Sequence, residues 1–143
     1  MKKNTLLLAA IAVTVLLSSC MSRKSSASPT LVNTAWQLVH AGSLTYDPKP
    51  GVRIISIKLS TDKRIAGFLG CNNLLGSYEL SKGDHISFKV ASTQMYCQGD
   101  AMKFEDAFNK ALTNANKYKV EGARLFLFQE DGTLLADFKV MNN

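Results

Sequence analysis

One stretch of the sequence decides how this chain folds: Gly67-Phe68-Leu69-Gly70-Cys71-Asn72-Asn73-Leu74-Leu75-Gly76-Ser77-Tyr78. Three glycines and two asparagines interrupt an otherwise apolar strand pattern there. Glycine and asparagine tolerate positive φ, and glycine also allows two backbones to come close together. We therefore expect a kink in the middle of the stretch. Gly67, inside a strand pattern, predicts a bulge or a close backbone approach.

Period-two alternation of apolar and polar residues on either side of this stretch predicts β-strands. In the segment 53–59, for example, Ile55, Ile57 and Leu59 share one face. The short segment 77–80 is expected to be a strand of its own. The complete set of expected strands covers residues 34–39, 53–59, 64–69, 77–80, 85–90, 118–121, 124–128 and 134–140.

The periodicity changes to three and four residues between these strands and predicts one helix, from about residue 101 to residue 115. Asp100 is expected to cap its start. The apolar stripe consists of Phe104, Ala107, Phe108, Ala111 and Leu112. The polar residues Glu105, Asp106, Asn109 and Lys110 are expected on the opposite, exposed face.

An open flat sheet of this size would leave exposed edges. We therefore expect an α+β fold that is mostly β. It would be a strongly bent antiparallel sheet or incomplete barrel of about seven to eight strands, with one helix packed against it.

The first 19 residues are typical of a signal peptide. Lys2 and Lys3 form a positive start, and an apolar run from Leu6 to Leu17 follows. This run is shorter than the ~20 residues of a membrane-spanning helix, so the pattern indicates a secretory signal. It ends in Leu17-Ser18-Ser19-Cys20, which resembles the lipobox of bacterial lipoproteins.

The lipobox resemblance implies that Cys20 receives a diacylglycerol on its sulfur, that the chain is cut before it and that the new amine is acylated. Two or more acyl chains hold a protein stably on a membrane. A plain cleavable signal would instead leave Cys20 as an ordinary thiol. A longer anchor helix is contradicted by the polar run 22–26. We expect a flexible tether over residues 20–30 and one domain over residues 31–143.

The remaining cysteines, Cys71 and Cys97, are expected to form a disulfide because an exported chain meets an oxidising compartment. The enclosed loop of about 25 residues would give roughly 3.5 kcal/mol of stabilisation. The bond would fasten the kink to the irregular stretch 92–97 before the helix. The alternative is two buried free thiols.

Composition and motifs give little support for catalysis. The histidines, His40 and His85, are expected to be exposed, and a thiol of Cys71 or Cys97 with His85 is the sole Cys–His candidate. The sequence contains no metal-binding, phosphate-binding or hydrolase motif. We expect no catalytic residue, no metal and no cofactor.

The chain is mildly basic, with 17 basic and 11 acidic residues and a net charge of +6. The mature part, without Lys2 and Lys3, would carry +4. A charge of this size suits solubility and contact with anionic lipid heads. Nucleic acid is not an expected partner, because no basic run with interleaved aromatics is present.

Three segments together carry a family resemblance: G-C-N-N-L-L-G-S-Y at 70–78, T-Q-M-Y-C at 93–97 and E-D-A-F-N-K-A-L at 105–112. In this order, with Trp36 before them and V-E-G-A-R-L-F-L-F after them, they resemble the META domain family, also called HslJ-like or DUF306. The resemblance covers about Asn33 to Phe138.

This resemblance implies a small envelope protein, often a lipoprotein, and an incomplete antiparallel barrel with a helix. Some members are linked to heat shock and to novobiocin resistance. No catalytic residue carries over. The matching positions, which we interpret as fold-defining, are Gly70, Cys71, Asn72, Gly76, Tyr78, Thr93, Met95 and Cys97.

Our first hypothesis is a non-enzymatic envelope lipoprotein that binds a protein partner or supports the envelope under stress. We expect it to be monomeric and anchored at Cys20 to the outer membrane, on the periplasmic face. The second hypothesis is a carrier of a lipid or another hydrophobic ligand in the barrel interior. The third is a Cys–His hydrolase or redox enzyme, which requires reduced Cys71 and Cys97.

Overall fold

The computed structural model describes residues 28–142, which form nine strands and one helix. The signal peptide, Cys20 and most of the expected tether lie outside the described residues. The strands and the helix are β1 (Ala35–Ala41), β2 (Leu44–Thr45), β3 (Ser56–Leu59), β4 (Arg64–Phe68), β5 (Asn73–Leu80), β6 (Ile86–Ser92), α1 (Asp100–Asn114), β7 (Lys117–Glu121), β8 (Arg124–Phe128) and β9 (Leu134–Val140).

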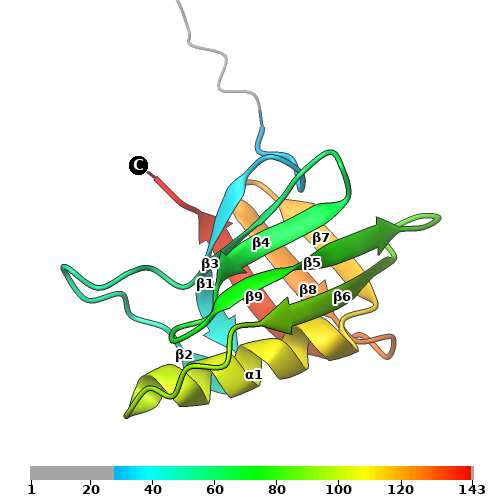
Figure 1. Cartoon of the computed structure of the whole chain (residues 1–143). Coiled ribbons are helices and arrows are strands. Elements are labelled where there is room, and N and C mark those ends of the chain that lie inside the picture. The colour runs from blue at the N-terminus through cyan, green and yellow to red at the C-terminus, as the bar shows by residue number, and fades with distance from the viewer. Residues whose placement is uncertain (1–27, 143) are drawn as a thin grey trace, which may run out of the picture.

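All strands belong to one antiparallel sheet in the order β6-β5-β4-β3-β1-β9-β8-β7, with the short β2 paired to β1. The sheet curls so that its two edge strands, β6 and β7, approach each other, and α1 lies across the lower opening of the resulting half-barrel (Figure 1). The expected fold class, mostly β with one helix, is confirmed. The count of nine exceeds the expectation because β2 has two residues, too few to show alternation.

The edge strands meet only at one end of the barrel, which we call the bridge end (residues 84–86 and 116–118). The Ile86 amide donates to the Asn116 carbonyl at 2.9 Å and the Tyr118 amide donates to the Asp84 carbonyl at 2.8 Å. Because the main chain makes these bonds, they depend little on which side chains are present. The other end of the same strands, beyond Ser92, lacks such a bridge within the described residues.

The expected alternation of the strands is confirmed in the core. Trp36 and Leu38 of β1 are fully buried, and so are the inward residues Ile57 and Leu59 of β3. The core is closed from below by α1, whose Phe108 ring lies 5.4 Å from that of Phe138 on β9. Aromatic and aliphatic side chains thus fill the barrel interior.

The expected short strand 77–80 is wrong, because β5 begins at Asn73 and runs through Gly76. Glycine is needed inside this strand: a Cβ on Gly76 would lie 2.2 Å from the Lys89 carbonyl oxygen of β6. The same reason explains Gly67, where a Cβ would lie 2.3 Å from the Ser56 carbonyl oxygen of β3. The predicted close backbone approach at Gly67 is therefore confirmed.

The helix begins one residue earlier than expected, and Asp100 is not its cap. Gly99 occupies the N-cap position with φ 77°, and no side chain caps the helix start. Asp100 lies in the first turn, where a negative charge interacts favourably with the helix dipole. Its side chain bonds instead to Lys103 at 3.0 Å, and this bond lowers the pKa of the Asp100 carboxyl.

Candidate functional site

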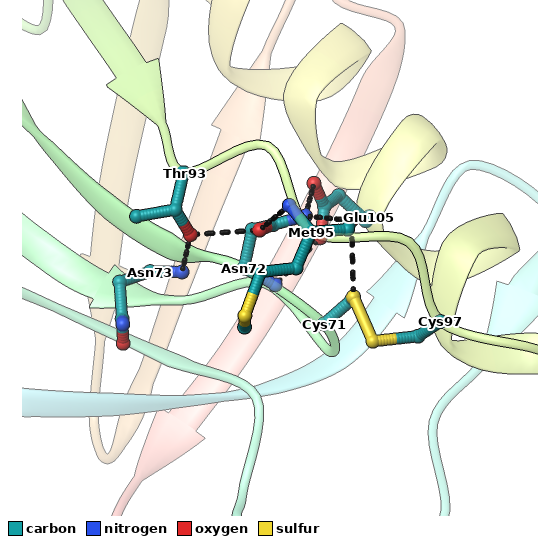
Figure 2. Close-up of a disulfide and its surroundings, with 7 residues drawn as sticks. All are labelled: Cys71, Asn72, Asn73, Thr93, Met95, Cys97 and Glu105. Carbon is teal, nitrogen blue, oxygen red and sulfur yellow. Dashed lines mark hydrogen bonds between the residues drawn. A yellow bond between two sulfur atoms is a disulfide. The ribbon is translucent and has the colours of Figure 1, made fainter.

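The barrel end opposite the bridge end is held by a disulfide and by side chains, and we call it the disulfide end (residues 70–73, 93–97 and the start of α1). Cys71 follows β4 and Cys97 precedes α1, and their sulfurs are bonded with the Cα atoms 5.8 Å apart. The bond joins Cys71 and Cys97, which both lie outside the strands (Figure 2).

Asn72 connects these segments through its side-chain amide. Its Oδ1 accepts hydrogen bonds from the Thr93 hydroxyl at 2.7 Å and from the Met95 amide at 2.8 Å. Its Nδ2 donates to the Met95 carbonyl and to Glu105 Oε1, both at 2.9 Å. An amide side chain has two donors and two acceptor sites, so Asn72 uses its full capacity. It holds both polar groups of the Met95 backbone, as a neighbouring strand would (Figure 2).

Glu105 anchors Asn72 from the helix, and its expected place on the exposed face is wrong. Its side chain is buried, and Oε2 accepts the Asn72 backbone amide at 2.8 Å. The spacing along the helix indicates that Glu105 is buried, because Glu105 lies three residues before Phe108 and seven before Leu112. Those steps place it beside the apolar stripe rather than opposite it. Its charge by itself predicts an exposed side chain, since unpaired carboxylates are seldom buried.

The loop that Asn72 fixes presents apolar side chains to solvent, and we call residues 93–97 the display loop. Met95 is 56% exposed and Tyr96 is 83% exposed. Their backbone is held by Asn72 at Met95 and by the disulfide at Cys97. The Met95 carbonyl also lies 3.4 Å from the Cys71 sulfur. This is a contact and not a hydrogen bond, because a disulfide sulfur carries no hydrogen.

The other matching positions serve the fold. Gly70 has φ 123°, and a Cβ there would lie 2.9 Å from the Ala101 carbonyl oxygen. Tyr78 is buried on β5, near the bridge end, and its hydroxyl donates to the Ser60 carbonyl at 2.8 Å. Gly70 thus belongs to the disulfide end, whereas Tyr78 lies outside it. Gly76 lies between them on β5.

The structure does not bring His85 together with either cysteine. His85 is half exposed at the bridge end, where Nδ1 lies 3.1 Å from the Lys82 carbonyl and Nε2 lies 3.7 Å from Glu130. His40 is also half exposed, and its Nδ1 lies 2.7 Å from Oδ1 of the buried Asp137.

Arg124 pairs with the same carboxylate from the other side. The Asp137 carboxylate is therefore fully engaged by two cationic or hydrogen-bonding partners. Between residues 28 and 142, no group of three or more His, Cys, Asp or Glu side chains is arranged to hold a metal ion.

The fold and the disulfide end define a class of small, mostly β domains. In this class a helix closes one opening of a half-barrel, and a disulfide links the kink after β4 to the segment before that helix. The META domain family model matches residues 29–142. The chain therefore belongs to the META domain family.

Similar solved structures share this architecture. The NMR structure of a protein from Burkholderia xenovorans is 28% identical, with a TM-score of 0.61 over 79% of this chain and 85% of that one. The crystal structure of a DUF4847 family protein from Bacteroides vulgatus is 15% identical, with a TM-score of 0.60 over 79% of this chain and 96% of that one. A further NMR structure is 18% identical, with a TM-score of 0.59 over 76% of this chain and 92% of that one. The comparison with curated proteins gives no match.

For the part of the chain that the structure describes, no helix has both the length and the apolar character that crossing a membrane requires.

Proposed function

We propose that this protein is a non-enzymatic envelope lipoprotein that binds a protein partner through the display loop. The observation that carries the proposal is the combination of an exposed Met95–Tyr96 pair with a backbone fixed by Asn72 and the Cys71–Cys97 disulfide. The partner surface it fits is an apolar groove or pocket that accepts an aromatic ring.

Rigidity makes the exposed pair useful for binding. Ordering a loop and its side chains costs binding free energy, and a loop that is already fixed avoids most of that cost. Tyrosine contributes a large apolar ring and a polar hydroxyl, and it dominates many protein interfaces. Tyr96, at 83% exposure, has no structural reason to be aromatic, since little of its ring is covered by the domain.

The position of the loop suits a tethered protein. The described chain starts at residue 28, and Val32 soon after it forms a bridge with Leu59, next to the turn between β3 and β4. The disulfide end lies at the opposite end of β4, roughly 17 Å away for a five-residue strand. In Figure 1 the described chain begins at the top, and α1 starts at the bottom of the domain. A lipid anchor at Cys20 would therefore attach the domain at the end opposite the display loop.

Two features support the absence of catalysis. Both thiols of the domain are consumed by the disulfide. The two histidines lie away from that bond. His40 contacts the Asp137 carboxylate at 2.7 Å, and His85 contacts the Lys82 carbonyl at 3.1 Å.

The filled barrel interior also weighs against carriage of a lipid tail, because Trp36, Phe108 and Phe138 are fully buried there.

The test is site-specific photocrosslinking of the full-length protein in its own cells. A photoreactive phenylalanine analogue replaces Tyr96 in one strain and Leu80 in a control strain. Leu80 is an exposed apolar residue at the bridge end of β5, with 44% of its surface accessible. We expect one defined envelope protein to be crosslinked from position 96 and not from position 80.

A second variant, Cys20→Ala, tests the anchor in the same strains. We expect it to leave the membrane fraction, while the wild-type protein remains there. Equal crosslinking from both positions, or none from position 96, would contradict binding through the display loop. Tight membrane association of Cys20→Ala would contradict lipidation.

A further inference from the structure

A pocket beside the disulfide end lies between the start of α1 and the loop that precedes β3. Its volume is about 180 Å³. The buried Ile55 forms part of its wall, together with Ala101 of α1. The pocket is separate from the side chains of Met95 and Tyr96, which do not line it.

Two aromatic rings set the shape of this pocket. Tyr46 and Phe104 line it and meet edge to face, with ring centroids 5.5 Å apart and an interplanar angle of 76°. Aromatic rings prefer such arrangements, and a third ring can join them in the same geometry. The Tyr46 hydroxyl oxygen accepts the Ile55 amide at 3.1 Å, which fixes the Tyr46 ring.

The volume suits one ring. An engineered apolar cavity of roughly 150 Å³ in another protein binds benzene. A pocket of about 180 Å³ with walls of Ile55, Tyr46 and Phe104 therefore has room for a ring with a small substituent. A lipid tail would be too long for it.

The charges at the rim favour an anionic substituent. Lys49 and Arg53 line the pocket, and neither is paired with a carboxylate among the described residues. The Arg53 guanidinium is instead held by the Asn73 amide oxygen at 2.7 Å and lies 4.2 Å from the Phe68 ring centroid. Asn73 and Phe68 line a neighbouring hollow and not this pocket, so Arg53 adds positive charge near the rim, whereas Lys49 is the cation available to a carboxylate there.

Of the two acids at the rim, Asp100 is already occupied. Lys103 bonds its carboxylate at 3.0 Å, and the charge of Lys49 also acts on it and helps to lower the pKa of the Asp100 carboxyl. Asp47 is the other acid, so three cations, Lys49, Arg53 and Lys103, face two carboxylates around the rim. One positive charge is thus left over at the mouth of the pocket.

We propose that the pocket between Tyr46 and Phe104 binds a small aromatic acid, with the ring against Ile55 and the carboxylate at Lys49. This site goes beyond the proposed function and does not depend on it. The display loop and the pocket are tested by different variants, so failure of one leaves the other standing.

The experiment is an NMR titration of the ¹⁵N-labelled soluble domain, residues 28–143, with benzoate, benzyl alcohol and benzylamine as probes. Before the titration, the amide spectrum is compared with that of the full-length protein in detergent, to establish that the domain keeps its fold. We expect benzoate to give saturable shifts at the amides of Ile55, Ala101 and Phe104 in the millimolar range. Benzyl alcohol should bind more weakly and benzylamine weakest.

Three variants sharpen the result. Ala101→Leu fills the pocket and should reduce benzoate affinity by about tenfold or more, which corresponds to ~1.4 kcal/mol. Ala107→Leu, a half-buried alanine of the same helix outside the pocket, is the matched control and should bind normally. Lys49→Gln should weaken benzoate about two- to fivefold, as expected for one exposed ion pair, and leave benzyl alcohol unchanged.

The absence of saturable shifts at these amides in the wild-type domain would overturn the site. Equal loss of binding in Ala101→Leu and Ala107→Leu would also overturn it, because the effect would then not come from filling the pocket. Binding of benzylamine as strong as that of benzoate would overturn the assignment of an acid.

Discussion

The two ends of the half-barrel are held in different ways. At the bridge end, the backbones of β6 and β7 bond directly, between Ile86 and Asn116 and between Tyr118 and Asp84. At the disulfide end the β5–β6 ladder stops with the bond from the Thr93 amide to the Asn73 carbonyl at 3.1 Å. Beyond that bond, one amide side chain, one carboxylate and one disulfide hold the two segments together.

This difference shows where the type of side chain matters. Main-chain bonds can be made by any residue except proline, so the bridge end tolerates many side chains. The disulfide end depends on Asn72, because a side-chain amide offers two donors and two acceptor sites. Glutamine is the other residue with this group, but its side chain is longer by one methylene. The most distinctive part of the sequence is accordingly the part where the ladder is missing.

The largest effect is expected for Asn72→Ala. The change removes the bonds of the amide to Met95 and Glu105 and leaves the buried Glu105 carboxylate with fewer donors. Because buried charges without partners are costly, we expect the free energy of unfolding to fall by about 4 kcal/mol. Urea unfolding followed by circular dichroism measures it.

His85→Ala is the control for this prediction at the bridge end. Its ion-pair contacts are half exposed, so the change should stay within about 0.5 kcal/mol. Similar losses for Asn72→Ala and His85→Ala would show that the two ends do not differ as described.

The second effect concerns the disulfide itself. Replacement of both Cys71 and Cys97 by alanine should lower the free energy of unfolding by roughly 3.5 kcal/mol, since the unfolded chain loses its cross-link. The Asn72 bonds should keep the display loop in place, so the amide spectrum should change mainly around residues 71 and 97. An unfolded double variant in buffer would mean that Asn72 and Glu105 contribute less than we infer.

The smallest effect is expected near the bridge end, at Tyr78. Burial raises the pKa of the Tyr78 hydroxyl above 10.0, and the nearby Asp62 charge adds to the shift. The unfolded chain then ionises first, so stability is fully present below pH 10 and falls as the pH rises above it. Tyr78→Phe should remove this alkaline fall and cost about 1 kcal/mol at neutral pH through the lost bond to Ser60.

The measurement compares the free energy of unfolding of wild type and Tyr78→Phe as a function of pH. The difference between the two curves should be constant below pH 10 and should shrink above it. A difference that stays constant up to high pH would contradict the raised pKa of Tyr78.

Much of the half-barrel could be predicted from alternation, because a strand with one buried face records that face in every second residue. Arg124–Phe128 and Leu134–Val140 begin and end where the pattern placed them. The method fails where a partner strand demands glycine: Gly76 interrupts the pattern of β5, yet it lies inside the strand because the Lys89 carbonyl is too close for a Cβ.

Only part of the candidate site could be predicted from the sequence. Cys71, Asn72, Thr93, Met95 and Cys97 stand out in the sequence, but nothing in it pairs Asn72 with Glu105. Their separation of 33 residues is closed only when α1 packs under the sheet. A buried carboxylate is also a poor prediction from composition, because its cost is met by donors that lie elsewhere in the chain.

The sequence by itself determined the strand pattern, the helix and the family resemblance, since these follow from local periodicity and from motif order. Only the tertiary structure decided that Glu105 lies inside, that Tyr96 lies outside on a fixed loop and that Tyr46 and Phe104 enclose a pocket. The physical reason is the same in each case. Whether a polar or aromatic side chain is buried depends on partners that reach it from distant segments, and no local pattern records them.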